Sequence, residues 1–154
     1  LTRQAVPTLD RDEYASADGV AKGAYVLADA AGETPDVILV ATGSEVQLAV
    51  DARKLLKAKG VDARVVSMPC REWFVMQPDD YQESVLPKAV RARVSVEAAT
   101  DFGWSDIIGD AGRSVAIDHF GASADAATLF QEFGFTPEAV VSAAEESIAA
   151  AGGN

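Results

Sequence analysis

The apolar run at residues 37–41 (VILVA) constrains the fold of this chain more than any other feature. Because it contains no polar residue and is rich in β-branched side chains, it is typical of a strand buried on both faces of a parallel sheet. Residues 44–59 repeat apolar side chains at three- and four-residue spacings, which predicts an amphipathic helix that ends at Gly60. A second apolar run at residues 61–68 completes a unit of strand, crossover helix and strand.

The start of this helix carries two overlapping capping signatures. Thr42 with Glu45, or Ser44 with Gln47, would satisfy backbone amides that lack partners in the first turn. A turn of this kind at the end of a strand could also hold an anion. The spacing matches neither common phosphate-binding loop, and Glu45 adds negative charge, so the capping interpretation is favoured.

The remaining chain predicts more short strands and helices of the same type. Residues 22–27 form a candidate edge strand, close enough in sequence to pair with residues 37–41 as an antiparallel hairpin. Further strands are expected at 93–97 and 114–117, short helical turns at 69–78 and 80–85, and helices at 101–108, 124–133 and 136–152. The residues expected to face the core in the last three helices are Phe102, Trp104, Ile107, Ile108, Leu129, Phe130, Phe133, Val140, Ala144 and Ile148. The predicted fold is a three-layer α/β/α sandwich with a mostly parallel sheet of about five strands and one antiparallel edge strand.

Composition narrows the class of protein. A length of 154 residues suits one domain, and a net charge of −11 disfavours nucleic acid and anionic membrane surfaces as partners. No apolar run approaches the roughly 20 residues that span a bilayer, and the first residues do not resemble a secretory signal. Cys70 is the single cysteine, so an internal disulfide is excluded and a reducing, cytoplasmic location is expected.

The beginning of the chain resembles the end of another domain. There is no initiator methionine, and residues 1–4 (LTRQ) read as the end of a strand before a polar connector. We therefore expect residues 1–20 to be the tail of a preceding domain and a linker, and residues 21–154 to be the domain itself. Arg3 could clamp a phosphate with its guanidinium, or it could be part of an exposed end.

His119 and Ser123 are the only candidates for a hydrolase triad. The segment 121–125 (GASAD) lacks the second glycine of a nucleophile elbow, and the histidine precedes the serine, against the usual order. Ser123 is therefore expected to cap the following helix. A single histidine and a single cysteine cannot supply a familiar structural zinc site.

Three other groups have a structural and a functional interpretation. Cys70 could be a reactive thiol, but only Arg71 is near enough in sequence to activate it, so a packing role is favoured. An aromatic stacking pocket could form from Trp73, Phe74 and Trp104, although such residues more often seal the edge of a sheet. The acidic pair at residues 145–146 is most simply a solvated helix face.

Eight short segments in order give the chain a family resemblance. They are residues 1–4, 23–27, 41–46, 65–69, 84–87, 96–98, 120–124 and 133–136. Each is weak alone, but their order and spacing resemble the C-terminal domain of transketolase over nearly the whole chain.

This resemblance implies a homodimeric parent enzyme that moves a two-carbon ketol unit between sugar phosphates, using thiamine diphosphate and magnesium. It implies that both cofactors are held by the upstream domains of the same chain and that no catalytic, cofactor or metal residue lies in this domain. It also implies that Arg3 matches the family arginine that holds the substrate phosphate.

Two other functions stay open. The chain could be a stand-alone binding or docking module related to the C-terminal domains of other thiamine-dependent enzymes, or a small hydrolase that uses Ser123 and His119. Whether the carboxyl ends of the strands hold a regulatory ligand is also open.

Overall fold

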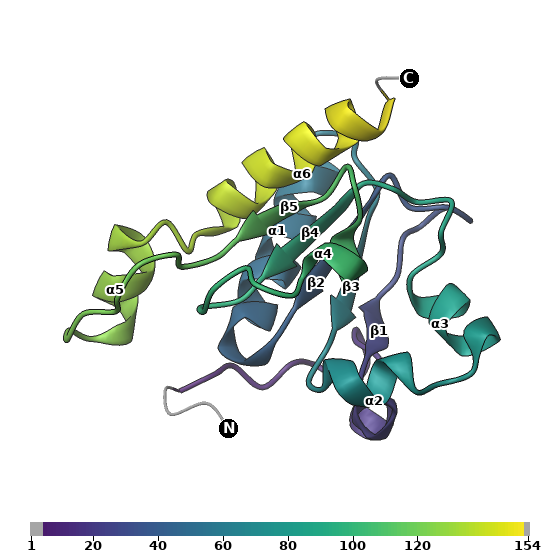
Figure 1. The fold of residues 1–154 in the computed structure, drawn as a ribbon, viewed down its shortest axis with the longest axis horizontal. Helices are drawn as coiled ribbons and strands as arrows, with labels where there is room; N and C mark the ends of the chain where they lie inside the picture. Colours follow the sequence, from purple (N-terminus) through teal and green to yellow (C-terminus); the bar gives the residue numbers. More distant parts are fainter. Residues whose placement is uncertain (1–4, 153–154) are drawn as a thin grey trace.

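The run at residues 37–41 forms the central strand of a five-stranded sheet in the computed structural model, which describes residues 5–152 (Figure 1). This strand, β2 (Val37–Ala41), is fully buried. The strand order is β1-β3-β2-β4-β5, where the others are β1 (Tyr25–Ala28), β3 (Ala63–Ser67), β4 (Arg93–Val96) and β5 (Arg113–Val115). All neighbours pair in parallel except β1, which pairs antiparallel with β3. The predicted mixed sheet with one antiparallel edge is confirmed.

Helices cover both faces of the sheet. The α-helices are α1 (Val46–Ala58), α2 (Arg71–Val75), α3 (Asp79–Val85), α4 (Ser105–Ile108), α5 (Ala126–Glu132) and α6 (Pro137–Gly152), and two 3₁₀ turns are η1 (Ala17–Lys22) and η2 (Gly43–Glu45). The long helices α1 and α6 lie side by side on one face, and the short helices α2, α3 and α4 lie on the other (Figure 1). None of the helices within residues 5–152 has the length and hydropathy that a membrane span requires.

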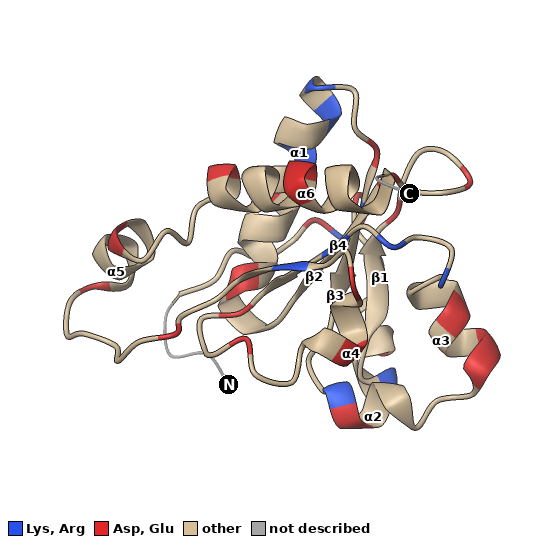
Figure 2. Ribbon diagram, turned by 45° about the horizontal axis from the view of Figure 1, so that its top comes forward, with Lys and Arg blue, Asp and Glu red and all other residues tan. Residues whose placement is uncertain are grey.

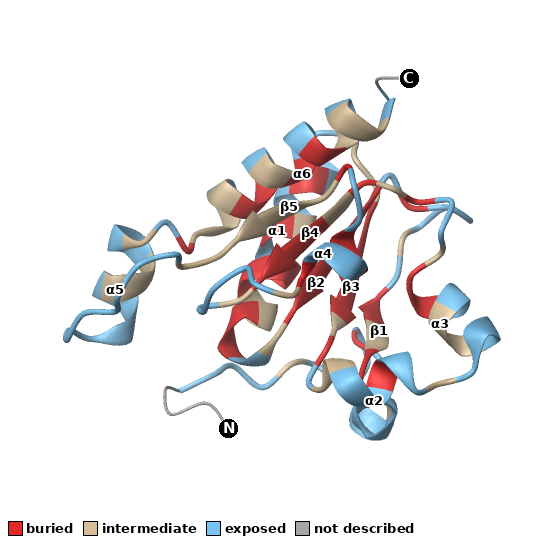
Figure 3. Cartoon of the chain, in the orientation of Figure 1, coloured by how far each residue is buried: buried red, intermediate tan, exposed pale blue. Residues whose placement is uncertain are grey.

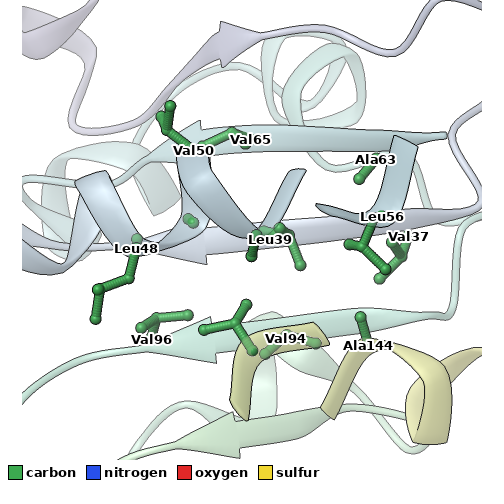
Figure 4. Close-up of a cluster of buried hydrophobic side chains, with 14 of the residues drawn as sticks. Val37, Leu39, Leu48, Val50, Leu56, Ala63, Val65, Val94, Val96 and Ala144 are labelled. Carbon is green, nitrogen blue, oxygen red and sulfur yellow. The ribbon is translucent and has the colours of Figure 1, made fainter. Parts of the chain in front are cut away.

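The core consists of two clusters, because alternate residues of β2 point to opposite faces. Val37 and Leu39 pack against Leu56 of α1 and Ala144 of α6 in one cluster (Figure 4). Ile38 and Val40 pack against the short helices on the other face. Both clusters are drawn as buried in Figure 3. The three-layer arrangement is therefore the one predicted from the apolar run.

The partner of the edge strand differs from the prediction. β1 pairs with β3 and not with β2, because both sides of β2 are taken by β3 and β4. Arg64 on β3 holds the end of β1 in place, since its guanidinium binds the carboxylate of Asp29 with a shortest distance of 2.7 Å. The loop then returns over β3, where the carboxylate of Asp62 accepts the amides of Ala31 and Gly32. The connection from β1 to β2 therefore passes over β3 instead of forming the expected hairpin.

The start of the first helix also differs. The α-helix begins at Val46 after a 3₁₀ turn, and neither Thr42 nor Glu45 makes the predicted side-chain cap bond. Each has another partner: Thr42 Oγ1 donates to a carboxylate oxygen of Glu97 at 3.5 Å, and Ser44 Oγ donates to Glu45. The capping box of Thr42 with Glu45 was therefore predicted wrongly, because these partners engage the same side chains.

Two later helices are shorter than predicted. Helix 101–108 is reduced to the single turn α4, because Gly103 has a φ of +88° that interrupts helical geometry, and Phe102 is 89% exposed instead of buried. Helix 124–133 begins at Ala126, and Asp125, not Ser123, is its cap. The inward face of α5 is only half-buried, at Leu129, Phe130 and Phe133.

The predicted helix ends and the last helix are confirmed. Gly60 follows α1 with a φ of +80°, which suits glycine at a helix C-terminus. Thr136 caps α6 by accepting the amide of Ala139 at 3.2 Å. Val140 and Ala144 are fully buried, and Ile148 packs against the same core.

Candidate functional site

The carboxyl ends of β2, β3 and β4 meet at one edge of the sheet, where open α/β sheets usually bind ligands. Glu97 follows β4 directly and lies at the centre of this edge. Its Oε2 accepts the indole N–H of Trp104 at 2.7 Å, and its Oε1 accepts the hydroxyl of Thr42 at 3.5 Å. Both carboxylate oxygens therefore have partners within the domain, which indicates a structural role for Glu97.

A cavity of about 300 Å³ opens beside Glu97. It is lined by Thr42, Met68, Pro69, Cys70, Arg71, Glu72, Glu97, Phe102 and Trp104. The guanidinium of Arg71 is directed to the carbonyl of Gly103 and to Asp106 at 3.3 Å, so it does not face the cavity as a free cation. The lining thus combines two carboxylates with one engaged guanidinium, which does not favour an anion.

Cys70 has a partner at this edge. Its thiol donates to Glu72 at 3.5 Å, and its backbone amide donates to the carbonyl of Gly23 at 3.0 Å. The pKa of Glu72 lies below its ordinary value, first because its own backbone amide donates to the carboxylate and second because the thiol does. Gly23 has a φ of +84°, and a β-carbon there would collide with the carbonyl of Cys70. Cys70 therefore takes part in a close backbone contact between η1 and α2.

The aromatic stacking pocket, which was the less favoured interpretation of Trp73, Phe74 and Trp104, does not assemble. Phe74 and Trp104 are buried in the core on the face of the short helices, whereas Trp73 is 54% exposed. Two of the three rings therefore seal the sheet, as the structural interpretation expected.

The hydrolase triad does not assemble either. His119 Nδ1 is hydrogen-bonded to the carbonyl of Phe120 at 2.9 Å, and its ring lies edge-on to Phe133 with centroids 4.8 Å apart. Ser123 is exposed, and within residues 5–152 no hydrogen bond joins it to His119. The carboxylate of Asp125 accepts the amide and hydroxyl of Thr128, which lowers its pKa.

The family resemblance implies that the parent enzyme uses thiamine diphosphate and magnesium. The described residues, 5–152, contain no group of three or more histidine, cysteine or acidic side chains that could hold a metal ion. The carboxylate at the most suitable edge, Glu97, already binds two internal donors. These residues do not fit the cofactor pair. The residue predicted to bind substrate phosphate, Arg3, lies outside the described residues.

Two arginines with internal partners were not identified from the sequence: Arg64, which is buried, and Arg93, which is partly buried. Arg64 donates to the carbonyls of Ser84 and Val85 as well as to Asp29, and Arg93 donates to four carbonyls at the ends of nearby loops and helices. Arg64 interrupts the apolar strand at residues 61–68, and Arg93 is the first residue of the strand at 93–97; a charged residue within a strand was the available signal. The acidic pair is exposed as predicted, with Glu145 bound to Lys59 at 2.6 Å.

A family model described as the transketolase-like C-terminal domain matches residues 23–136. The chain belongs to this family. The match covers most of the chain, and the predicted resemblance is confirmed.

Individual transketolases agree with this assignment. The transketolase of Mycobacterium leprae is 58% identical over 149 residues, which are 95% of this chain and 21% of that protein. The chloroplastic transketolase of Solanum tuberosum is 49% identical over 147 residues, 95% of this chain and 19% of that protein. The solved transketolase of Pichia stipitis in complex with sedoheptulose-7-phosphate superposes with a TM-score of 0.84 and 41% identity over 96% of this chain and 20% of that one. The chain thus spans about a fifth of the length of these relatives.

Proposed function

We propose that this chain is the C-terminal part of a transketolase whose other domains carry the catalytic machinery. The parent enzyme would transfer a two-carbon ketol unit between sugar phosphates in the pentose phosphate pathway, with thiamine diphosphate and magnesium bound outside this domain. The observation that carries the proposal is the 58% identity to a transketolase along 95% of the chain. The engaged Glu97 and the separate His119 and Ser123 support a structural or regulatory role for the domain.

The organisation of the parent follows from the same proposal. Residues 1–20 would be the tail of the preceding domain and a linker, and the partners of this domain would be the upstream domains of the same chain. The parent would be a cytoplasmic homodimer. Size-exclusion chromatography with light scattering and cell fractionation of the full-length protein would test these two points.

Arg3 is the one residue of this chain proposed to touch substrate. A guanidinium binds a phosphate with two parallel hydrogen bonds, and hydrogen bonds to charged groups contribute about 1.5–3 kcal/mol each. Replacing Arg3 with methionine in the full-length enzyme should therefore raise KM for the ketose phosphate roughly 10- to 100-fold, and Arg3→Lys should fall between, because lysine keeps the charge without the fork.

Kinetics on phosphorylated and unphosphorylated ketoses provide the test. The loss should be confined to the phosphorylated substrate. The control variant is Arg11→Met, since Arg11 lies in the exposed linker and, among residues 5–152, donates to the carbonyl of Ala15 at 3.4 Å. Equal losses on both substrates would contradict the role of Arg3 in phosphate binding, and absence of any ketol transfer by the unaltered enzyme would contradict the proposed function.

A further inference from the structure

Two loops at the carboxyl edge of β4 and β5 form an exposed apolar surface. The amide of Glu97 donates to the carbonyl of Val115 at 3.1 Å, and that of Ile117 donates to Ala99 at 2.8 Å, so the loops continue the pairing of the strands. A cavity of about 550 Å³ lies between them, lined by Ala98, Ala99, Thr100, Ile117, Asp118, His119, Phe120 and Gly121. Phe120 at its rim is 97% exposed.

An aromatic side chain in this position is costly to leave in water. Burying a phenylalanine removes a large apolar surface from water, although single exposed apolar residues are common on proteins. Phe120, however, borders an open cavity, and Phe102, which lines the neighbouring cavity beside Glu97, is 89% exposed. Two exposed phenylalanines at one edge of the sheet indicate a surface that is covered in the intact protein.

Helix α5 extends this surface away from the sheet (Figures 1 and 3). It has seven residues, none of them buried, whereas an isolated helix needs about 12–15 residues to be even marginally stable in water. Its support from the domain comes through Phe130, which packs against Phe135 with ring centroids 5.6 Å apart, and through the half-buried Phe133 that follows it. The outer side of α5 therefore offers a second face for packing.

The position of the first described residues indicates which partner covers the surface. Val6, Pro7 and Leu9 lie against Ser44 and Ser67, which places the start of the domain at the carboxyl edge as well. A C-terminal domain that makes up about a fifth of its relatives is preceded by the remainder of the protein. In a longer transketolase, the preceding residues would therefore connect to this domain at the same carboxyl edge of the sheet, on the side of β2 and β3.

Charge adds a chemical requirement for the partner. Asp101, Asp118 and Asp125 are all exposed around the surface, and Figure 2 shows acidic residues along the segment that leads into α5. No lysine or arginine occurs between Arg113 and the end of α5. A complementary surface would present an apolar pocket bordered by lysine or arginine.

We propose that the Phe120 surface, defined as residues 98–102, residues 117–121 and α5, packs against the domain that precedes this one in the same polypeptide. Phe120 inserts into an apolar pocket of that domain, and Asp118 faces a basic side chain beside it. The assignment shares one premise with the proposed function, namely that this chain is one domain of a longer transketolase.

Photo-crosslinking in the full-length protein tests the assignment. Benzoylphenylalanine at position 120 keeps the phenylalanine ring, extends it by a benzoyl group, and reacts with neighbouring C–H bonds on illumination. The expected product is a crosslink within one polypeptide, between position 120 and a peptide of the preceding domain, which migrates at the monomer mass. The matched control places the same group at position 55, because Leu55 is an exposed apolar residue near the other end of α1 and should give no such crosslink.

Each outcome has one meaning. A crosslinked product of twice the monomer mass would assign the surface to a second copy of the chain and overturn the proposal. Absence of a crosslink, or a yield equal to that at position 55, would show that the surface is uncovered and overturn it too. Ketol transfer is measured on the same sample, so a crosslink without activity would reject the proposed function alone, and activity without a crosslink would reject the Phe120 surface alone.

Discussion

Ser147 shows how a single buried hydroxyl can join three parts of this fold. It is fully buried on α6, its Oγ accepts the amide of Arg93 at 2.9 Å, and its proton lies within reach of the carbonyls of Ala111 at 2.8 Å and Arg93 at 3.2 Å. The last helix is thereby fixed to the start of β4 and to the turn before β5. Every buried side-chain nitrogen or oxygen within residues 5–152 has such a partner.

Replacing Ser147 with alanine should lower the free energy of unfolding by about 1–3 kcal/mol, because the buried amide of Arg93 and carbonyl of Ala111 lose their partner. Urea unfolding followed by circular dichroism measures the change. Ser142→Ala is the control, since Ser142 lies exposed on the same helix and should change stability by less than about 0.5 kcal/mol. Equal effects of the two variants would contradict the role assigned to Ser147.

Asp62 gives the fold a dependence on pH. Its pKa lies below 3.8, mainly because the amides of Gly32 and then Ala31 donate to its carboxylate. A carboxyl group with a depressed native pKa stabilises the fold above its unfolded pKa, and this contribution disappears as the pH falls through the lower native value. Asp62 therefore stabilises the fold at neutral pH and loses this effect in acid.

The variant Asp62→Asn should be less stable than the unaltered protein at about pH 7, and the difference should shrink below about pH 4. Urea unfolding across this range measures it. Asp12→Asn, in the exposed linker, serves as the control. A stability difference that stays constant from neutral to acid pH would be inconsistent with the ionised carboxylate as the acceptor.

At the scale of the element, α1 shows that the burial of a residue depends on its position on the helix and not only on its type. Leu55 and Leu56 are adjacent, yet Leu56 is fully buried against the sheet and Leu55 is 39% exposed (Figure 4 shows Leu56). Because consecutive residues of a helix are rotated by about 100°, the same residue type meets two environments.

Leu56→Ala should destabilise the domain by about 2–5 kcal/mol, because a cavity is left between α1 and the sheet. Leu55→Ala should cost much less, about 1 kcal/mol or below. Thermal unfolding of both variants provides the comparison. Similar costs would mean that the face of α1 has been assigned incorrectly.

Element types were predictable where the signal is local. The run at 37–41 and the spacing of Val140 and Ala144 determine β2 and α6 without help from distant residues. The hairpin and the capping box were predicted wrongly because they depend on remote partners, namely Arg64 for the end of β1 and Glu97 for Thr42. Local sequence cannot reveal such competitors.

The candidate site shows the same division between local and remote signals. Sequence order and the missing glycine argued against a triad, and the bond from His119 to the carbonyl of Phe120 agrees. Cys70 was expected to have a packing role, but its donation to Glu72 was not foreseen. Exposure of Phe102 and Phe120 could not be predicted, because it depends on how the loops leave the sheet.

At the scale of the whole molecule, the domain should lack catalysis of its own. An isolated chain of residues 1–154 should show no ketol transfer and no rise in melting temperature with thiamine diphosphate and magnesium, because a ligand that does not bind the native state cannot stabilise it. A coupled ketol-transfer assay and differential scanning fluorimetry measure the two properties. Either a measurable turnover or a cofactor-dependent shift would contradict this expectation.

The antiparallel pairing of β1 with β3 also affects how the protein is made. Of the strands described in this sheet, β1 leaves the ribosome first, yet its partner is synthesised only after β2 and α1. β1 can therefore pair at the edge of the sheet only after β2, α1 and β3 have been synthesised.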